Sequence, residues 1–168
     1  MRYSDSYIAN HDIDWFCTIG GLCVHVASAG GKIPELINDD YQLRTIQHQV
    51  ELLPDIYSDK DISYNEAAIS RAIGQDNGPN ARAQYLKSFS AMARKGFISL
   101  DKKNIADPED NHYQIVCWPS YLDRMPLGLD LPEYTLDGDD DNSFVVDYEN
   151  DGSVVVIITR GNNRNSER

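Results

Sequence analysis

Hydrophobic and polar positions follow a strand-like pattern near the start of the chain, in residues 14–28, DWFCTIGGLCVHVAS. Two β-rich runs flank Gly20 and Gly21, and glycine adopts the positive φ of a two-residue hairpin loop without steric cost. This loop predicts three apolar cross-strand pairs on one face: Ile19 with Leu22, Cys17 with Val24, and Trp15 with Val26. His25 then falls on the opposite face, beside Phe16 and Cys23.

The middle of the chain has helical spacing and predicts three helices. The first covers about residues 39–53, with Asn38 as its N-cap. The second begins at Ser63, where SYNE fits a capping box, and ends at Gly74. The third has Pro79 in its first position and ends at Gly96.

Strands are expected again after the third helix. Residues 97–100 and 113–117 predict a pair of strands joined by a long polar connection. Near the C-terminus, an Asp-Gly pair at 151–152 between two valine-rich runs predicts another hairpin. We therefore expect an α+β fold with an N-terminal β-hairpin, a three-helix core with a β-hairpin wing, and a C-terminal β-hairpin.

This pattern also suggests how the chain is divided. We expect the N-terminal hairpin and the core in residues 1–118 and an irregular acidic linker in 119–142. The C-terminal hairpin, 143–160, should pack on the core, and the tail, 161–168, should be disordered.

The order of elements in residues 39–118 resembles a winged helix-turn-helix domain. The resemblance rests on ISYNEAAISRAIG before the turn, NGPNARAQYLKSFSAMARKG as the recognition-type helix, and FISLDKKNIADPEDNHYQIVCW as the wing. It implies that the third helix and the wing contact DNA.

The distribution of charge is compatible with that expectation. The whole chain has a net charge of −12, but residues 71–103 contain seven basic and two acidic residues, a net of +5. Lysine and arginine are the residues that contact phosphates, and Asn or Gln can read base edges. The candidate nucleic-acid-binding residues are Asn80, Arg82, Gln84, Lys87, Arg94, Lys95, Lys102 and Lys103. The alternative is an ordinary solvated helix face.

An acidic stretch near the C-terminus suggests a second function. Residues 130–151 contain nine carboxylates and no lysine or arginine. Such a segment can shield the basic helix or dock a basic protein partner, as in an adaptor or inhibitor. Its DGDDDN run departs from an EF-hand loop, which requires Gly and Glu where Asn142 and Tyr148 stand.

No catalytic, metal or cofactor motif is recognisable, so catalytic and metal residues and cofactors are expected to be absent. An enzyme of a type without a known motif is the third alternative. The three cysteines, Cys17, Cys23 and Cys117, lack metal spacing and are expected to be buried free thiols. Without an apolar leader or a membrane span, a cytoplasmic location is the default, and the oligomeric state stays open.

Overall fold

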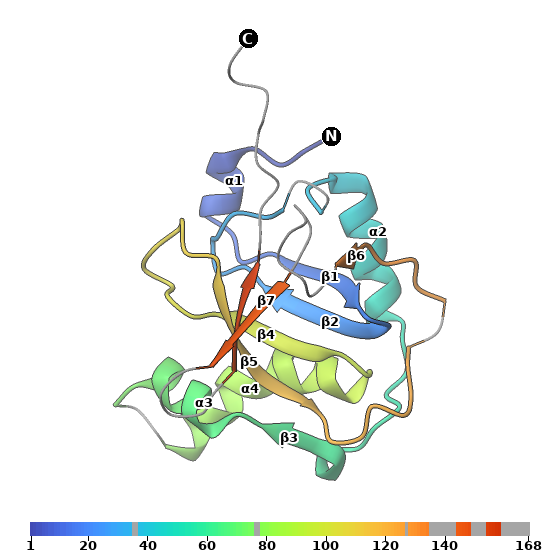
Figure 1. Cartoon of the computed structure of the whole chain (residues 1–168), viewed down its shortest axis with the longest axis vertical. Coiled ribbons are helices and arrows are strands. Elements are labelled where there is room, and N and C mark those ends of the chain that lie inside the picture. Colours follow the sequence, from blue (N-terminus) through green and yellow to red (C-terminus); the bar gives the residue numbers. More distant parts are fainter. Residues whose placement is uncertain (35–36, 76–77, 127, 135–143, 149–153, 159–168) are drawn as a thin grey trace.

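Among the residues that the computed structural model describes, eight strands form one mixed sheet, accompanied by four α-helices (Figure 1). The described residues are 1–34, 37–75, 78–126, 128–134, 144–148 and 154–158. The strands are β1 (Asp14–Ile19), β2 (Leu22–Ala27), β3 (Ile62–Tyr64), β4 (Ile98–Lys102), β5 (His112–Pro119), β6 (Glu133–Tyr134), β7 (Phe144–Tyr148) and β8 (Val154–Ile158). The helices are α1 (Asp5–Ala9), α2 (Asp40–Glu51), α3 (Glu66–Ile73) and α4 (Pro79–Arg94).

The N-terminal hairpin has the register that the sequence predicted. β1 and β2 are antiparallel, and all three apolar pairs expected on one face occur. Gly20 and Gly21 form the loop with φ of 54° and 82°, values that favour glycine. His25 lies on the other face, where its ring centroid is 5.3 Å from that of Phe16. The prediction of this hairpin is therefore confirmed.

The sheet is mixed because β2 pairs in parallel with β4 on the side away from β1. A parallel pair needs a long crossover connection, and here that connection contains α2, β3, α3 and α4. The sheet order is β6-β1-β2-β4-β5-β8-β7, and β3 pairs with β5. Both outer hairpins, β1–β2 and β7–β8, therefore belong to the same sheet.

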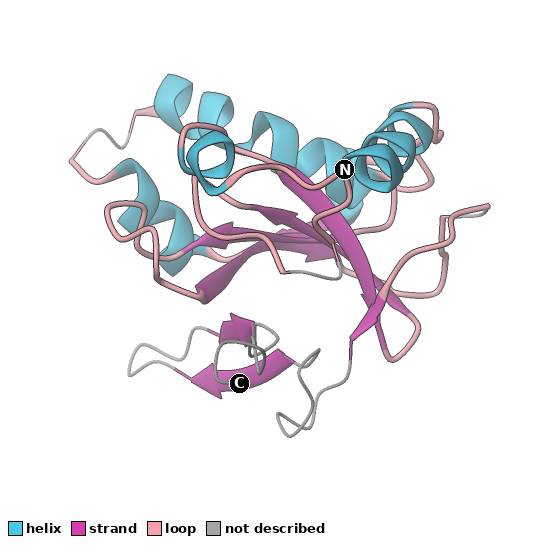
Figure 2. Ribbon diagram, turned by 90° about the horizontal axis from the view of Figure 1, so that it is seen from above, coloured by secondary structure: helices cyan, strands magenta, loops and turns pink. Residues whose placement is uncertain are grey.

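The helices lie on one side of the sheet, and the β7–β8 hairpin, which joins the sheet through β5, lies away from them (Figure 2). α2 contributes Ile46 and Val50 to a core with Phe16 and Phe97. α4 contributes apolar residues to a neighbouring core with Val116 of β5: Leu86, Phe89 and Ala93. These apolar residues recur at helical spacing, and they form the faces that α2 and α4 bury.

Two predicted helix boundaries are wrong. α2 is capped by Asp39 rather than Asn38, because the Asp39 side chain accepts a hydrogen bond from the Gln42 backbone N–H. Ser63 does not begin a helix: it lies in β3, which pairs with β5. The helix begins later, after Asn65, whose side chain accepts from the Ala68 N–H at 3.2 Å. Pairing with β5 holds Ser63 in an extended conformation and overrides the local capping signal.

The strands predicted as a wing are central strands. β4 and β5 are antiparallel, as expected, but β4 also pairs with β2 and β5 also pairs with β8. The α+β class is confirmed, whereas the three-helix core with a peripheral wing is replaced by helices layered on an extensive sheet. The resemblance to a winged helix-turn-helix domain stays a prediction.

The C-terminal region is described only in part. β7 and β8 are antiparallel, and β8 joins the sheet by pairing with β5. The predicted turn at Asp151 and Gly152, the DGDDDN run at 137–142 and the tail 161–168 lie outside the described residues. In the described part of the chain, no helix combines the length and apolar character needed to cross a membrane.

Candidate functional site

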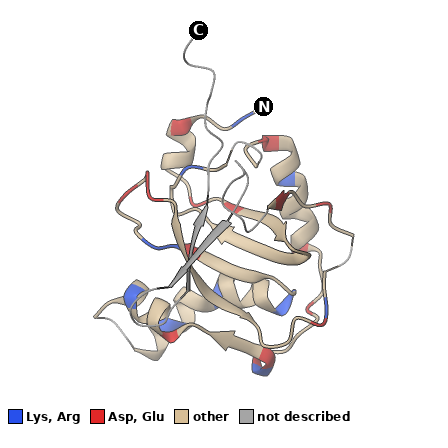
Figure 3. Cartoon of the chain, in the orientation of Figure 1, with Lys and Arg blue, Asp and Glu red and all other residues tan. Residues whose placement is uncertain are grey.

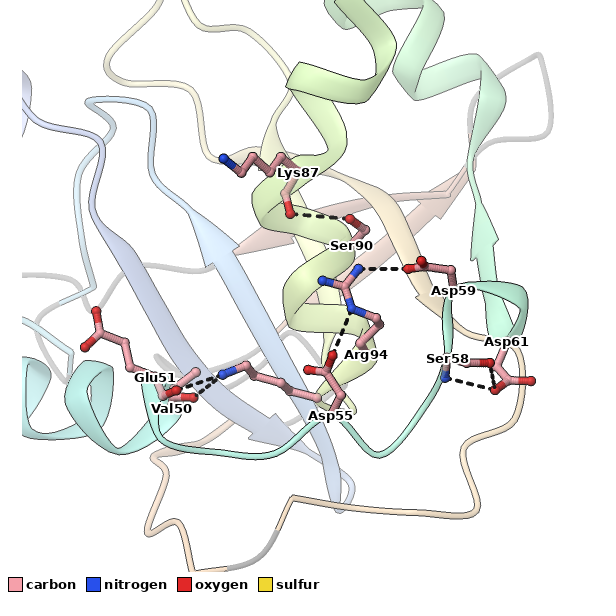
Figure 4. Close-up of polar contacts among 10 residues, drawn as sticks. Val50, Glu51, Asp55, Ser58, Asp59, Asp61, Lys87, Ser90 and Arg94 are labelled. Carbon is pink, nitrogen blue, oxygen red and sulfur yellow. Dashed lines mark hydrogen bonds and ion pairs between the residues drawn. The ribbon is translucent and has the colours of Figure 1, made fainter. Parts of the chain in front are cut away.

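The eight predicted nucleic-acid-binding residues come from α4 and from the segment that follows it. Three of them are exposed on α4: Asn80, Gln84 and Lys87. The Lys87 side chain extends away from Arg94 (Figure 4). These three side chains are accessible, and their contact with nucleic acid stays a prediction.

The two predicted arginines on α4 are held by carboxylates of the same chain. Arg82 makes a two-pronged ion pair with Glu66, with N–O distances of 2.6 and 2.8 Å. Arg94 bridges Asp55 and Asp59 at 3.1 and 2.9 Å (Figure 4). Two-pronged and bridged guanidinium pairs have well-defined geometry, so these positive charges are already partly compensated.

The predicted lysines are dispersed. The Lys95 ammonium donates to the carbonyls of Val50 and Glu51 at 2.8 and 3.0 Å, at the C-terminal end of α2. Lys102 is buried, and its ammonium donates to the Asp107 carbonyl. Lys103 is half-buried, and its backbone N–H donates to His112. The eight residues therefore do not gather into one uniformly positive face, and an acidic position adjoins a basic one where α3 approaches α4 (Figure 3).

A pocket of about 360 Å³ lies elsewhere, between the N-terminal segment, the start of β1, and α2. We call it the N-terminal pocket. Its polar lining consists of His11, Asp12, Asp14, Gln47 and Glu51, and its remaining lining of Tyr3, Tyr7, Ile13, Phe16, Val50 and Met92. Its volume lies within the range of small-ligand sites.

The N-terminal wall is fixed by hydrogen bonds to the segment before α2. Asn38 exchanges two bonds with the backbone of Tyr3: the Tyr3 N–H donates to Oδ1 at 2.9 Å and Nδ2 donates to the carbonyl at 3.2 Å. The Asp40 N–H donates to the Met1 carbonyl at 2.8 Å. As a result, α1 and α2 lie toward the same end of the molecule (Figure 1).

Three stacked rings form the outer edge of this wall. Tyr3, Tyr7 and His11 are spaced by four residues, which places them on one side of the α1 turn. The Tyr3–Tyr7 centroids are 4.8 Å apart and the Tyr7–His11 centroids 3.9 Å apart, with planes within 8° and 13° of parallel. His11 is also fixed by a bond from Nδ1 to the Tyr7 carbonyl at 2.7 Å.

A buried hydrogen-bond chain lies beneath the pocket. His25 is 1% exposed, and its Nε2 is 2.8 Å from Oδ1 of Asp14, while its Nδ1 is 3.0 Å from Oγ of Ser99. The single hydroxyl proton of Ser99 is also within reach of the Phe89 carbonyl oxygen, which lies 3.2 Å from Oγ. His25 therefore orients the half-exposed Asp14 carboxylate from below.

This hydrogen-bond chain contains the three residue types of a Ser-His-Asp triad, but its serine is buried and its aspartate is exposed to solvent. In a triad, the serine hydroxyl attacks the substrate, so it must be accessible. Here Ser99 is 0% exposed and Asp14 faces the pocket instead. The arrangement supports a fixed carboxylate rather than a nucleophile.

The three thiols are buried, and the described residues contain no metal-binding cluster. Cys17, Cys23 and Cys117 are buried free thiols, as predicted. Burial raises the pKa of Cys23 to about 11 and that of Cys117 to about 12, which keeps both thiols protonated. Among the described residues, no group of three or more His, Cys, Asp or Glu is arranged to hold a metal ion.

No family model, curated protein or solved structure matches this chain.

The N-terminal pocket was not predicted from the sequence. A usable signal was present: aromatic residues every four positions, followed by Asp12 and Asp14 directly before a hydrophobic strand. Gln47 and Glu51 could not be added from sequence, because the fold of the crossover brings α2 beside β1. Of the acidic segment 130–151, Asp130 and Glu133 are described and exposed.

Proposed function

We propose that this chain is a non-catalytic binding protein whose N-terminal pocket takes a positively charged group of a basic protein partner. The observation that carries the proposal is the charge of the pocket: Asp12, Asp14 and Glu51 line it, and no lysine or arginine does. The carboxylates are exposed at its rim, where a partner can reach them. The net charge of −12 favours encounter with a basic partner.

The binding role is favoured over catalysis by the burial of the reactive groups. Ser99 and Cys117 are 0% exposed, so neither hydroxyl nor thiol meets a ligand in the pocket. Asp14 is held by a hydrogen bond from His25 and is suited to accept bonds from a ligand. An adaptor or inhibitor that presents this surface fits these features.

The test is the binding of a fluorescently labelled peptide of alternating lysine and arginine, measured by anisotropy at low and at physiological salt. The double variant Asp12→Asn and Asp14→Asn should weaken binding at least ~10-fold, because hydrogen bonds to charged groups contribute roughly 1.5–3 kcal/mol each. Salt should weaken wild-type binding strongly. Binding that is equal in the variant and the wild type refutes the pocket as the site.

The matched control is the double variant Asp130→Asn and Glu133→Gln, which makes the same change in charge at exposed positions outside the pocket. Retained affinity in this control supports the N-terminal pocket. A loss confined to this control supports the acidic segment 130–151 as the docking surface instead.

A nucleic-acid interface on α4 is the second candidate. Its support is the exposure of Asn80, Gln84 and Lys87, three polar residues within two turns of one helix. Lys87→Glu should reduce salt-dependent binding to duplex DNA in a gel-shift titration, whereas Lys60→Glu, also exposed, should not. Absence of wild-type binding to duplex and single-stranded DNA and RNA at low salt rejects this candidate.

A further inference from the structure

The side-chain atoms that the N-terminal pocket leaves available are mainly acceptors. One of the two N–H groups of its amide is engaged, because Gln47 Nε2 donates to the Asp14 backbone carbonyl at 2.8 Å. One oxygen of each aspartate is engaged as well: Asp12 accepts from the Ala29 N–H at 2.8 Å, and Asp14 faces His25.

In the described part of the chain, the remaining acceptors converge on the pocket. They are the second oxygens of Asp12 and Asp14, the carbonyl oxygen of Gln47, and the Glu51 carboxylate, which lies 3.8 Å from Nδ1 of His48. With Nδ1 of His11 bonded to the Tyr7 carbonyl, Nε2 of the neutral ring is a further acceptor. A complementary ligand must therefore present several N–H donors and a positive charge.

The apolar lining of the pocket bears on the choice between the two common cationic side chains, lysine and arginine. Ile13, Phe16 and Val50 line the pocket and are largely buried, at 7%, 3% and 1% exposed. An ammonium is strongly hydrated, whereas a guanidinium is planar, more weakly hydrated and has five donors. The alkyl stem of an arginine can also pack on such a surface.

The chain itself holds guanidinium groups in this way. Arg94 bridges two carboxylates, those of Asp55 and Asp59. Near the pocket, Nε of Arg44 donates to the carboxylate of Asp40 at 2.5 Å and to the hydroxyl of Tyr3 at 3.2 Å. Carboxylates combined with a tyrosine are thus a working guanidinium site in this fold.

We infer that the N-terminal pocket selects a guanidinium group, supplied by an arginine side chain of the partner. The inference rests on the proposed function and narrows it from basic partners in general to those that present an accessible arginine. In the complex, Asp12 and Asp14 accept the guanidinium N–H groups, and the stem lies on Phe16 and Val50.

Isothermal titration of the full chain with N-acetyl-arginine amide and N-acetyl-lysine amide tests this inference. The arginine compound should bind at least ~10-fold more tightly, about 1.4 kcal/mol. Asp14→Asn should remove most of that preference, while Asp130→Asn should leave it unchanged. Because Asp14 also bonds a buried histidine, Glu51→Gln at an exposed position is a second variant that tests the site without altering the core.

The ring-proton NMR signals of His11 provide a local readout and should shift during the arginine titration. Equal affinity for the arginine and lysine compounds overturns the guanidinium inference and leaves the proposed function standing. Failure of both compounds and of the basic peptide to bind overturns both.

Methylguanidinium and an arginine-containing peptide complete the comparison and identify the source of the guanidinium. Tighter binding of the peptide supports a protein partner, because the acidic surroundings of the pocket add contacts beyond the single side chain. If methylguanidinium binds as tightly as the arginine-containing peptide, the guanidinium inference stands. The ligand is then a small molecule, and a protein partner is rejected.

Discussion

Asp101 in β4 is a buried carboxyl whose protonation should control part of the stability of the fold. It is 5% exposed and lies between β2 and β5, opposite Ala27 and Gln114. Burial raises its pKa from 3.8 to about 6, and the nearby Asp12 acts in the same direction. The Tyr85 hydroxyl, which donates to Oδ2 at 2.7 Å, opposes this shift.

The change Asp101→Asn removes this titration and keeps an oxygen that accepts from Tyr85. Because the folded chain binds the Asp101 proton more tightly than the unfolded chain, its contribution to stability is fully present below about pH 4 and is lost as the pH rises through about 6. A pKa that rises from 3.8 in the unfolded chain to about 6 in the folded chain corresponds to a total loss of about 3 kcal/mol in the free energy of unfolding. Of this, about 1.4 kcal/mol falls between roughly pH 5 and pH 8.

Urea unfolding followed by the fluorescence of buried Trp15 measures this effect. The free energy of unfolding of the variant, relative to wild type, should rise by about 1.4 kcal/mol from roughly pH 5 to pH 8. Every other titratable group is common to both proteins, so the variant-minus-wild-type difference isolates Asp101. Asp130→Asn, an exposed control, should show no such change, and a variant-minus-wild-type difference independent of pH would refute the reasoning.

Three further predictions concern the caps, the turns and the thiols. Asn65→Ala removes the α3 cap and the bond from Nδ2 to the Ile115 carbonyl, so unfolding in urea should become easier by about 1–2 kcal/mol; an unchanged midpoint contradicts this. Gly96→Ala should lower the stability by roughly 1–3 kcal/mol in the same assay, because φ is 102° and the added Cβ would lie 3.0 Å from side-chain atoms of Ile56 and Pro126; wild-type stability would refute this. The three thiols should react with Ellman's reagent only after unfolding in denaturant, since all are buried, and rapid reaction of the native chain would contradict this burial.

Local elements were the most predictable part of the fold. The β1–β2 register followed from alternating apolar residues and a two-glycine loop, and the α4 start from a proline in its first position. The errors arose where distant segments intervene, as at Asn38, which bonds the backbone of Tyr3, and at Ser63, whose partner in the sheet is Trp118. A capping signal involves only a few neighbouring residues, so it contains no information about a strand partner far along the chain.

The charge pattern shows the same limit at the candidate sites. The net of +5 in residues 71–103 is a property of the sequence, but the carboxylates that hold Arg82 and Arg94 lie outside that window, at Glu66, Asp55 and Asp59. Counting charges along the chain therefore overstated the basic character of α4.

The sequence by itself determined the α+β class, the hairpin register, the positions of α2 and α4 and the burial of the thiols, since periodicity and turn residues act between near neighbours. Only the tertiary structure decided the order of the strands and the existence of the N-terminal pocket. The pocket requires Asp14, Gln47 and Met92 to meet, and these residues are brought together by the crossover that places α2 and α4 on the same side of the sheet. Packing over such separations depends on the whole set of buried contacts, which no short stretch of sequence contains.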